Sequence, residues 1–135
     1  MKHLDVVAAI IIYNKQILCM QRGQAKYEYV SYKYEFPGGK IENGETKAEA
    51  LMRELREEMN ISLRISDEDH FITVHHAYPD FEITLHSYLC PVESKEFVRR
   101  EHVDHKWMYS PELSSLAWAE ADLPIVEKIM ELKIC

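Results

Sequence analysis

Hydrophobic residues gather along the chain in runs of two kinds, and each kind predicts a different element. A continuous apolar run rich in β-branched residues covers residues 5–13, which is typical of a strand buried on both faces. A short turn at Asn14-Lys15 separates it from residues 16–21, which are predicted to form its hairpin partner. Residues 22–33 are polar with aromatic residues interspersed, and we expect a loop there.

More strands are predicted further along the chain. Residues 33–36 have the composition of a short strand that stops at Pro37-Gly38-Gly39, and a second turn signal follows at Asn43-Gly44. The remaining strand-like segments are residues 70–77, 81–90 and 105–109. A turn at residues 78–80 joins the first two of these segments.

Two segments have the apolar period of a helix. In the first, Thr46 followed by Glu49 is a capping-box signature. The apolar side chains that follow share one face of the helix: Ala48, Leu51, Met52, Leu55 and Met59. The second segment, residues 122–132, has Pro124 in its first turn. Strands with two main helices predict an α/β (α+β) fold around a mixed sheet, in a single domain over residues 1–135.

Composition narrows the classes of protein. The 135 residues carry a formal net charge of −7, which argues against a binder of nucleic-acid backbone but allows a phosphate-bearing substrate with a metal cation. The N-terminal apolar run is too short to span a membrane and is a poor signal peptide, so we expect a cytoplasmic protein. Cys19, Cys90 and Cys135 are widely spaced, which favours free thiols over a disulfide or a zinc site.

Residues 53–58, RELREE, place three carboxylates within two turns of the first helix. Glu54 and Glu58 are four residues apart, and like charges at this spacing destabilise a helix by roughly 0.2–0.5 kcal/mol. Both fall beside one edge of the apolar stripe, with Glu57 a little further round. One interpretation is a solvated face with an Arg53–Glu57 salt pair. The other is a divalent-cation site, because Mg²⁺ accepts carboxylates, waters and phosphate oxygens.

The surrounding sequence carries a longer motif. Residues 39–61, GKIENGETKAEALMRELREEMNI, resemble the Nudix box, whose pattern is G, five residues, E, seven residues, then R-E-U-x-E-E-x-G-U with U aliphatic. The positions that match in register are Gly39, Glu45, Arg53, Glu54, Leu55, Glu57, Glu58 and Ile61. Asn60 stands where the pattern has Gly. Because Asn is the next-best residue for the left-handed conformation after a helix, we expect this departure to be tolerated.

The resemblance implies a Nudix-type α/β/α sandwich and an enzyme that cleaves a nucleoside diphosphate linked to a further group, using Mg²⁺ or, as a substitute, Mn²⁺. The implied metal ligands are Glu54, Glu57, Glu58 and a backbone carbonyl at Gly38 or Gly39. Arg53 is expected to hold Glu45 and to orient the glutamates. The metal would make a water acidic enough to attack phosphorus, with Glu54 as the candidate general base.

Residues outside the box resemble the MutT-type nucleoside triphosphate pyrophosphohydrolases. The stretch 34–45 is close to that branch and contains Glu35 and Phe36, which are candidate substrate contacts. Glu101 matches an additional acid near the metals, and Arg22 matches a residue near the nucleotide; a solvated loop Glu and a strand-end Arg are the alternatives. The aromatic residues that could stack on a base, or belong to the core, are Phe36, Tyr78 and Phe81.

Residues 116–126, LAWAEADLPIV, resemble the bacterial CTP pyrophosphohydrolases more than the 8-oxo-dGTP enzyme, which has Asn where this chain has Asp122. An ionised Asp only accepts hydrogen bonds, and cytosine offers its N4 amino group. Guanine also offers donors, at N1 and N2, so 8-oxo-dGTP stays an alternative substrate. Asp122 could instead cap the last helix, or do both.

Other functions stay open on the sequence alone. Some Nudix domains have lost catalysis and bind ligands or proteins, whereas the box acids here are complete. Hydrolysis of a nucleotide sugar or a dinucleoside polyphosphate has no specific signature in this chain. We expect a small nucleotide as the partner, no nucleic acid or membrane, and a monomer or homodimer.

Overall fold

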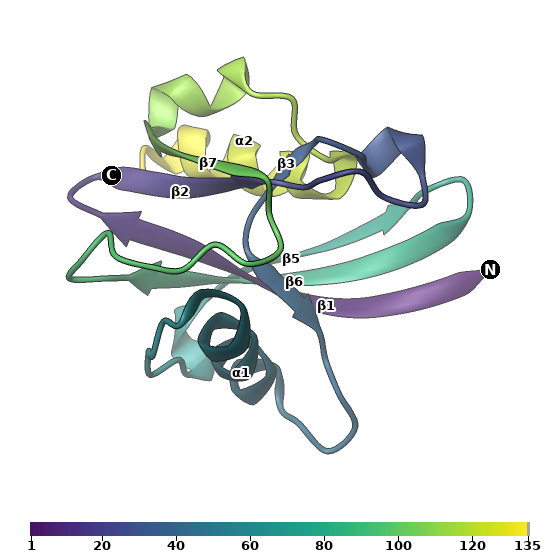
Figure 1. The fold of residues 1–135 in the computed structure, drawn as a ribbon, viewed down its shortest axis with the longest axis horizontal. Coiled ribbons are helices and arrows are strands. Elements are labelled where there is room, and N and C mark those ends of the chain that lie inside the picture. Colours follow the sequence, from purple (N-terminus) through teal and green to yellow (C-terminus); the bar gives the residue numbers. More distant parts are fainter. Residues whose placement is uncertain (135) are drawn as a thin grey trace.

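The computed structural model describes residues 1–134, and a mixed sheet lies at the centre of this part of the chain (Figure 1). The strands are β1 (Lys2–Tyr13), β2 (Gln16–Gln21), β3 (Tyr34–Glu35), β4 (Gly38–Lys40), β5 (His70–Ala77), β6 (Phe81–Pro91) and β7 (Asp104–Tyr109). Their order is β3-β2-β1-β6-β5, with β4 paired to β1 and β7 paired to β2. β1 and β6 run parallel, while β1 is antiparallel to β2 and β4. The predicted mixed sheet is confirmed.

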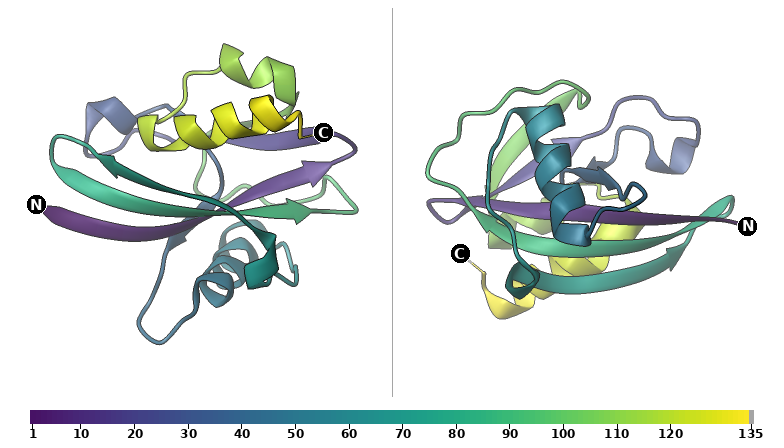
Figure 2. Two further views of the ribbon diagram at one scale, coloured as in Figure 1. Left: turned by 180° about the vertical axis from the view of Figure 1, so that it is seen from behind. Right: turned by 90° about the horizontal axis from the view of Figure 1, so that it is seen from below.

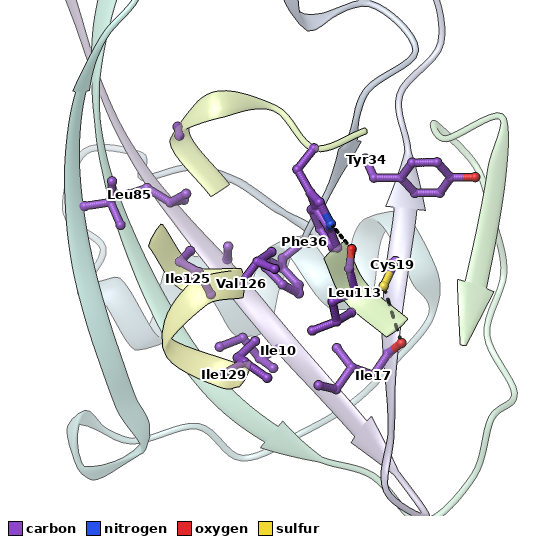
Figure 3. Packing of buried hydrophobic residues seen from close by; sticks show 14 of the residues in the cluster. Ile10, Ile17, Cys19, Tyr34, Phe36, Leu85, Leu113, Ile125, Val126 and Ile129 are labelled. Carbon is purple, nitrogen blue, oxygen red and sulfur yellow. Dashed lines mark hydrogen bonds between the residues drawn. The ribbon is translucent and has the colours of Figure 1, made fainter. Parts of the chain in front are cut away.

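Helices cover both faces of this sheet, as the views in Figure 2 show. They are α1 (Lys47–Met59) and α2 (Leu123–Leu132), and short 3₁₀ turns lie at η1 (Glu28–Val30), η2 (Asp67–Asp69), η3 (Ser110–Ser115) and η4 (Glu120–Asp122). Side chains of β1 alternate between the two layers: Val7 and Ile11 pack in a cluster with Leu51 and Leu55 of α1, whereas Ala8 and Ile10 pack in a cluster with Ile125 and Ile129 of α2. Figure 3 shows Ile10 in the second cluster. The predicted α/β/α sandwich is confirmed.

The ends of α1 have the caps that the sequence predicts. The Glu49 backbone N–H donates to Thr46 Oγ1 at 3.1 Å, and the Thr46 N–H donates to Glu49 Oε1 at 2.8 Å. Asn60 has φ 54° in the left-handed region, and its N–H donates to the Arg56 and Leu55 carbonyls. Asn therefore fills the role that Gly has in the Nudix pattern.

Some boundaries differ from the prediction. The first strand begins at Lys2 rather than residue 5, and the predicted loop 22–33 contains the turn η1. The predicted strand 33–36 corresponds to the two-residue β3, which ends before Pro37. The glycines that were expected to form a turn instead begin β4, which pairs with β1. A Cβ at Gly38 would lie 1.9 Å from the Val7 carbonyl oxygen, so only glycine permits this pairing.

Cys19 and Cys90 are buried free thiols, as predicted, and burial raises the pKa of each to about 12. Cys135 lies outside the described residues. Within residues 1–134, no helix has the length and hydrophobicity needed to cross a membrane.

Candidate active site

A cleft of about 870 Å³ opens beside β1, where β4, α1, the loop after β2 and η4 meet. This volume is at the upper end of the range for small-molecule sites. Many of the residues singled out in the sequence line it: Arg22, Glu35, Phe36, Gly38, Gly39, Glu54, Glu58, Tyr78, Phe81, Glu101 and Asp122. Glu45, Arg53 and Glu57 lie outside this lining. The fold thus gathers residues from both halves of the chain.

Arg53 is the centre of an ion-pair cluster beside the cleft. Its Nε donates to Glu45 Oε2 at 2.6 Å, and its Nη1 donates to Glu54 Oε1 at 3.0 Å and to Glu57 Oε2 at 3.3 Å. Its Nη2 also donates to the Lys40 carbonyl. The hydrogen bond from Arg53 lowers the pKa of Glu45. Arg53 therefore links two box glutamates on α1 to the chain before that helix.

Glu54 reaches into the cleft past β4. A Cβ on Gly39 would lie 2.4 Å from Glu54 Cδ, so the carboxyl group occupies the space that any larger residue at position 39 would need. Burial raises the pKa of Glu54, and the hydrogen bond from Arg53 opposes this shift. A carboxylate with a raised pKa is a better proton acceptor at neutral pH.

Glu58 lines the cleft together with Glu101, which comes from the loop between β6 and β7. Burial raises the pKa of Glu58, and the charge of Glu101 and a hydrogen bond between the two carboxyl groups raise it further. Neighbouring carboxyl groups resist being ionised together, and a cation relieves their repulsion. Glu101 therefore adds a third carboxyl group to the part of the cleft that Glu54 and Glu58 line.

No three His, Cys, Asp or Glu side chains among residues 1–134 are arranged to hold a metal ion by themselves. Mg²⁺ does not need such a cage, because it binds through one or two carboxylates together with waters and substrate phosphates. Glu54, Glu58 and Glu101 line the cleft and can supply one or two such carboxylates.

Glu35 contacts two side chains that also line the cleft, Arg22 and His102. Its Oε1 is 3.6 Å from Arg22 Nη1, and its Oε2 is 2.9 Å from His102 Nε2. His102 was not singled out in the sequence, and only its place next to Glu101 could have drawn attention to it. Both partners also line the cleft, so Glu35 helps fix the positions of Arg22 and His102.

Asp122 is only 6% exposed, and its Oδ2 accepts a hydrogen bond from the Phe36 N–H at 3.0 Å. Its side chain makes no capping hydrogen bond at α2, so the capping interpretation is wrong. A residue whose side chain caps a helix has an extended backbone, whereas the backbone of Asp122, the last residue of η4, is helical with φ −86° and ψ −17°. Burial raises the pKa of Asp122 well above its usual value, the charge of Glu35 adds to this, and the Phe36 hydrogen bond opposes it.

Aromatic side chains form one wall of the cleft. Phe36 is buried and packs on Trp118 with ring centroids 4.8 Å apart. Tyr78 is buried as well, and its hydroxyl accepts a hydrogen bond from the Ala121 N–H. Phe81 is partly exposed and stacks on Tyr27 at 5.6 Å. Tyr27 belongs to the loop after β2 and is not among the predicted site residues. Its place in this wall depends on contact with Phe81, which is distant in sequence.

The profile of the NUDIX domain matches residues 2–129. This chain belongs to the Nudix family. The residues that match the Nudix box, 39–61, cover most of β4, the whole of α1 and the turn between them.

Two relatives from Escherichia coli K12 share similar levels of identity with this Nudix chain. A CTP pyrophosphohydrolase is 34% identical over 134 residues, covering 98% of this chain and 96% of that protein. An 8-oxo-dGTP diphosphatase is 33% identical over 136 residues, covering 98% of this chain and all of that protein. The solution structure of the E. coli ORF135 protein has a TM-score of 0.81 and 33% identity, and the match covers 98% of this chain and 91% of that one.

Proposed function

We propose that the chain is a Mg²⁺-dependent nucleoside triphosphate pyrophosphohydrolase that prefers cytosine nucleotides. It converts a nucleoside triphosphate and water into a nucleoside monophosphate and pyrophosphate. The observation that carries this proposal is that Glu54 and Glu58 of the Nudix box line the same cleft as the buried Asp122. One ligand can therefore meet the carboxylates with its phosphates and Asp122 with its base. Nudix hydrolases use divalent metals, and both relatives named above act on nucleotides.

The Nudix box supplies the groups for phosphate chemistry. When bound, Mg²⁺ neutralises phosphate oxygens and makes a water more acidic. Glu54, Glu57, Glu58 and Glu101 are the carboxylates that would hold it, with the carbonyl of Gly38 or Gly39. Glu54 is placed to take the proton from the attacking water, because burial makes its carboxylate more basic. Arg53 keeps Glu54 and Glu57 in place through the contacts described above.

Asp122 supplies the preference for the base. One of its oxygens accepts the Phe36 N–H, which leaves the other free to accept the N4 amino group of cytosine. Arg22, Glu35 and Phe36 line the cleft beside it and complete the substrate-binding set.

The decisive variant is Asp122→Asn, assayed at a pH where Asp122 is ionised, because it keeps size and an acceptor oxygen but removes the charge. A hydrogen bond to a charged group is worth roughly 1.5–3 kcal/mol, so kcat/KM for CTP should fall about tenfold to a hundredfold. The ratio of kcat/KM for CTP to that for 8-oxo-dGTP should shift toward the oxidised guanine nucleotide. An unchanged ratio would contradict the role of Asp122 in reading the base.

Hydrolysis of 8-oxo-dGTP is the second candidate, and the state of Asp122 is the observation that favours it. Burial favours the neutral carboxyl group, which can donate a hydrogen bond as well as accept one. A neutral Asp122 could therefore bind an acceptor on an oxidised guanine. A kinetic panel of CTP, dCTP, 5-methyl-dCTP and 8-oxo-dGTP, with and without Mg²⁺, separates the two candidates. No Mg²⁺-dependent turnover of any of these would favour a ligand-binding Nudix module instead.

A further inference from the structure

The loop between β6 and β7 lies against the C-terminal end of α1. It passes beside that helix in Figure 1 and carries Glu101 toward the cleft. The last carbonyl groups of a helix have no partners within the helix itself. Here the loop supplies two partners: the Val98 N–H donates to the Met59 carbonyl at 3.0 Å, and Arg100 Nη1 donates to the Glu57 carbonyl at 2.5 Å.

The Arg100 contact joins the two segments that carry the acids. Arg100 is next to Glu101 in the chain, and the carbonyl that it binds belongs to Glu57, next to Glu58. Glu58 and Glu101 both line the cleft, and their charges repel each other when both are ionised. The hydrogen bonds of Val98 and Arg100 to α1 hold the loop against this repulsion, and the Arg100 contact is the one nearer Glu101 in the sequence. A guanidinium donating to a helix C-terminal carbonyl is a favourable tether, since that end of the helix is negative.

We infer that Arg100 is a positioning residue that holds Glu101 beside Glu58 and so prepares the cation site. This inference rests on the proposed function, because it gives Glu58 and Glu101 a cation to bind. Arg100 itself acts through the Glu57 backbone and not through the substrate. Its effect should therefore show in cation binding before any nucleotide is added.

The direction in which the Kd for Mn²⁺ changes in Arg100→Ala distinguishes a positioning role from a purely electrostatic one. Removing a positive charge near a cation site strengthens cation binding by Coulomb's law. Removing a tether that places a ligand weakens it. If Arg100 mattered only through its charge, Arg100→Ala would bind Mn²⁺ more tightly than the unmodified chain.

The experiment titrates the full chain with Mn²⁺ in the absence of nucleotide, by electron paramagnetic resonance or calorimetry. We expect Arg100→Ala to raise the Kd for Mn²⁺ about tenfold, the scale seen when a residue supporting a metal ligand is removed. Arg100→Lys, which still donates to the Glu57 carbonyl, should recover most of the affinity. The Mg²⁺ concentration needed for half-maximal turnover should move in the same direction and order.

Arg99→Ala is the matched control. Arg99 is also exposed, but it contacts His105 and Asp104 on β7 rather than α1. Arg99→Ala should leave the Kd for Mn²⁺ unchanged or lower it slightly through the loss of positive charge, and it should not raise it. Should Arg100→Ala fail to fold, as judged by its melting curve, Arg100→Met keeps the aliphatic stem and tests the same loss of donor.

The outcomes are distinct. Unchanged or tighter Mn²⁺ binding in Arg100→Ala or Arg100→Met, with normal binding and turnover in the unmodified chain, overturns the positioning role alone. An equal loss in Arg99→Ala also overturns it, because the effect would then belong to the loop in general. If the unmodified chain neither binds Mn²⁺ nor hydrolyses any nucleotide, the proposed function fails and the inference fails with it.

Discussion

Glu57 differs from the other box glutamates in its surroundings, because its side chain is 57% exposed and touches Arg53 outside the cleft lining. The geometry alone is compatible with a surface salt pair, so activity must decide its role. Glu57→Gln keeps the shape but removes the charge. If Glu57 is a ligand, kcat should fall by orders of magnitude while the melting temperature changes little, because metal charge stabilises the transition state by several kcal/mol. Near-normal turnover would make Glu57 a surface residue. Glu127→Gln, on the exposed side of α2, is the control.

The burial of Asp122 also leads to a prediction about how stability depends on pH. Its pKa is raised in the folded chain, so the folded state holds this proton at pH values where the unfolded chain has lost it. Stability from this group is complete below the ordinary pKa of Asp and is lost as pH rises through the raised value. Asp122→Asn cannot ionise and still accepts the Phe36 N–H. It should therefore be more stable than the unmodified chain at pH 7, with a difference that shrinks toward pH 4.

Urea unfolding of the two proteins at several pH values measures this difference, and the other titrating groups cancel in the comparison. A difference that is constant with pH would mean that the pKa of Asp122 is the same in the folded and the unfolded chain. The same variant tests the base preference, so selectivity and stability can be read from one protein.

At the scale of the element, β4 and α1 pack closely because Gly39 of β4 has no side chain. Gly39→Ala would place a methyl group 2.4 Å from Glu54 Cδ, so the Glu54 carboxyl group must move. We expect kcat to fall at least as far as in Glu54→Gln, with KM less affected, because the substrate cleft itself is not filled. Circular dichroism should show an intact fold. Activity close to that of the unmodified chain would show that Glu54 does not need its present position.

The elements differ in how well the sequence predicts them, because some depend on contacts between residues that are close in sequence and others on contacts between residues that are far apart in sequence. The caps of α1 are local, since Thr46 pairs with Glu49, and the box acids follow from helical spacing. β4 could not be predicted, because Gly38 becomes a strand only by pairing with Ala8 of β1. A turn signal and a close strand approach both call for glycine, and local sequence does not distinguish them.

The candidate site shows the same division. Glu54, Glu58, Glu101 and Asp122 were found by motif, and the structure brings all of them to one cleft. The hydrogen bond from Phe36 to Asp122 spans 86 positions of the chain, so nothing near Asp122 in the sequence indicates it. The local signal, an Asp before Leu-Pro, suggested a helix cap instead. The contact of Arg100 with α1 is equally non-local.

At the scale of the whole molecule, the net charge of −7 and the presence of Glu58 and Glu101 in one cleft mean that folding brings like charges together. A cation that binds only the folded state stabilises it by mass action. At ten times its Kd, Mg²⁺ should add roughly 1.4 kcal/mol to the free energy of unfolding. For a chain of 135 residues this corresponds to a rise in Tm of about 4–6 °C.

The measurement compares melting curves in millimolar MgCl₂ with curves in NaCl of equal ionic strength, because salt alone also screens repulsion between exposed charges. Only a rise specific to Mg²⁺ reports a site. In Glu58→Gln the repulsion is already relieved and a ligand is lost, so this variant should melt higher than the unmodified chain without Mg²⁺ and gain less when Mg²⁺ is added. A Tm that is the same in both salts, with no turnover gained, would mean that these acids do not form a cation site, and the repulsion between them would need another explanation.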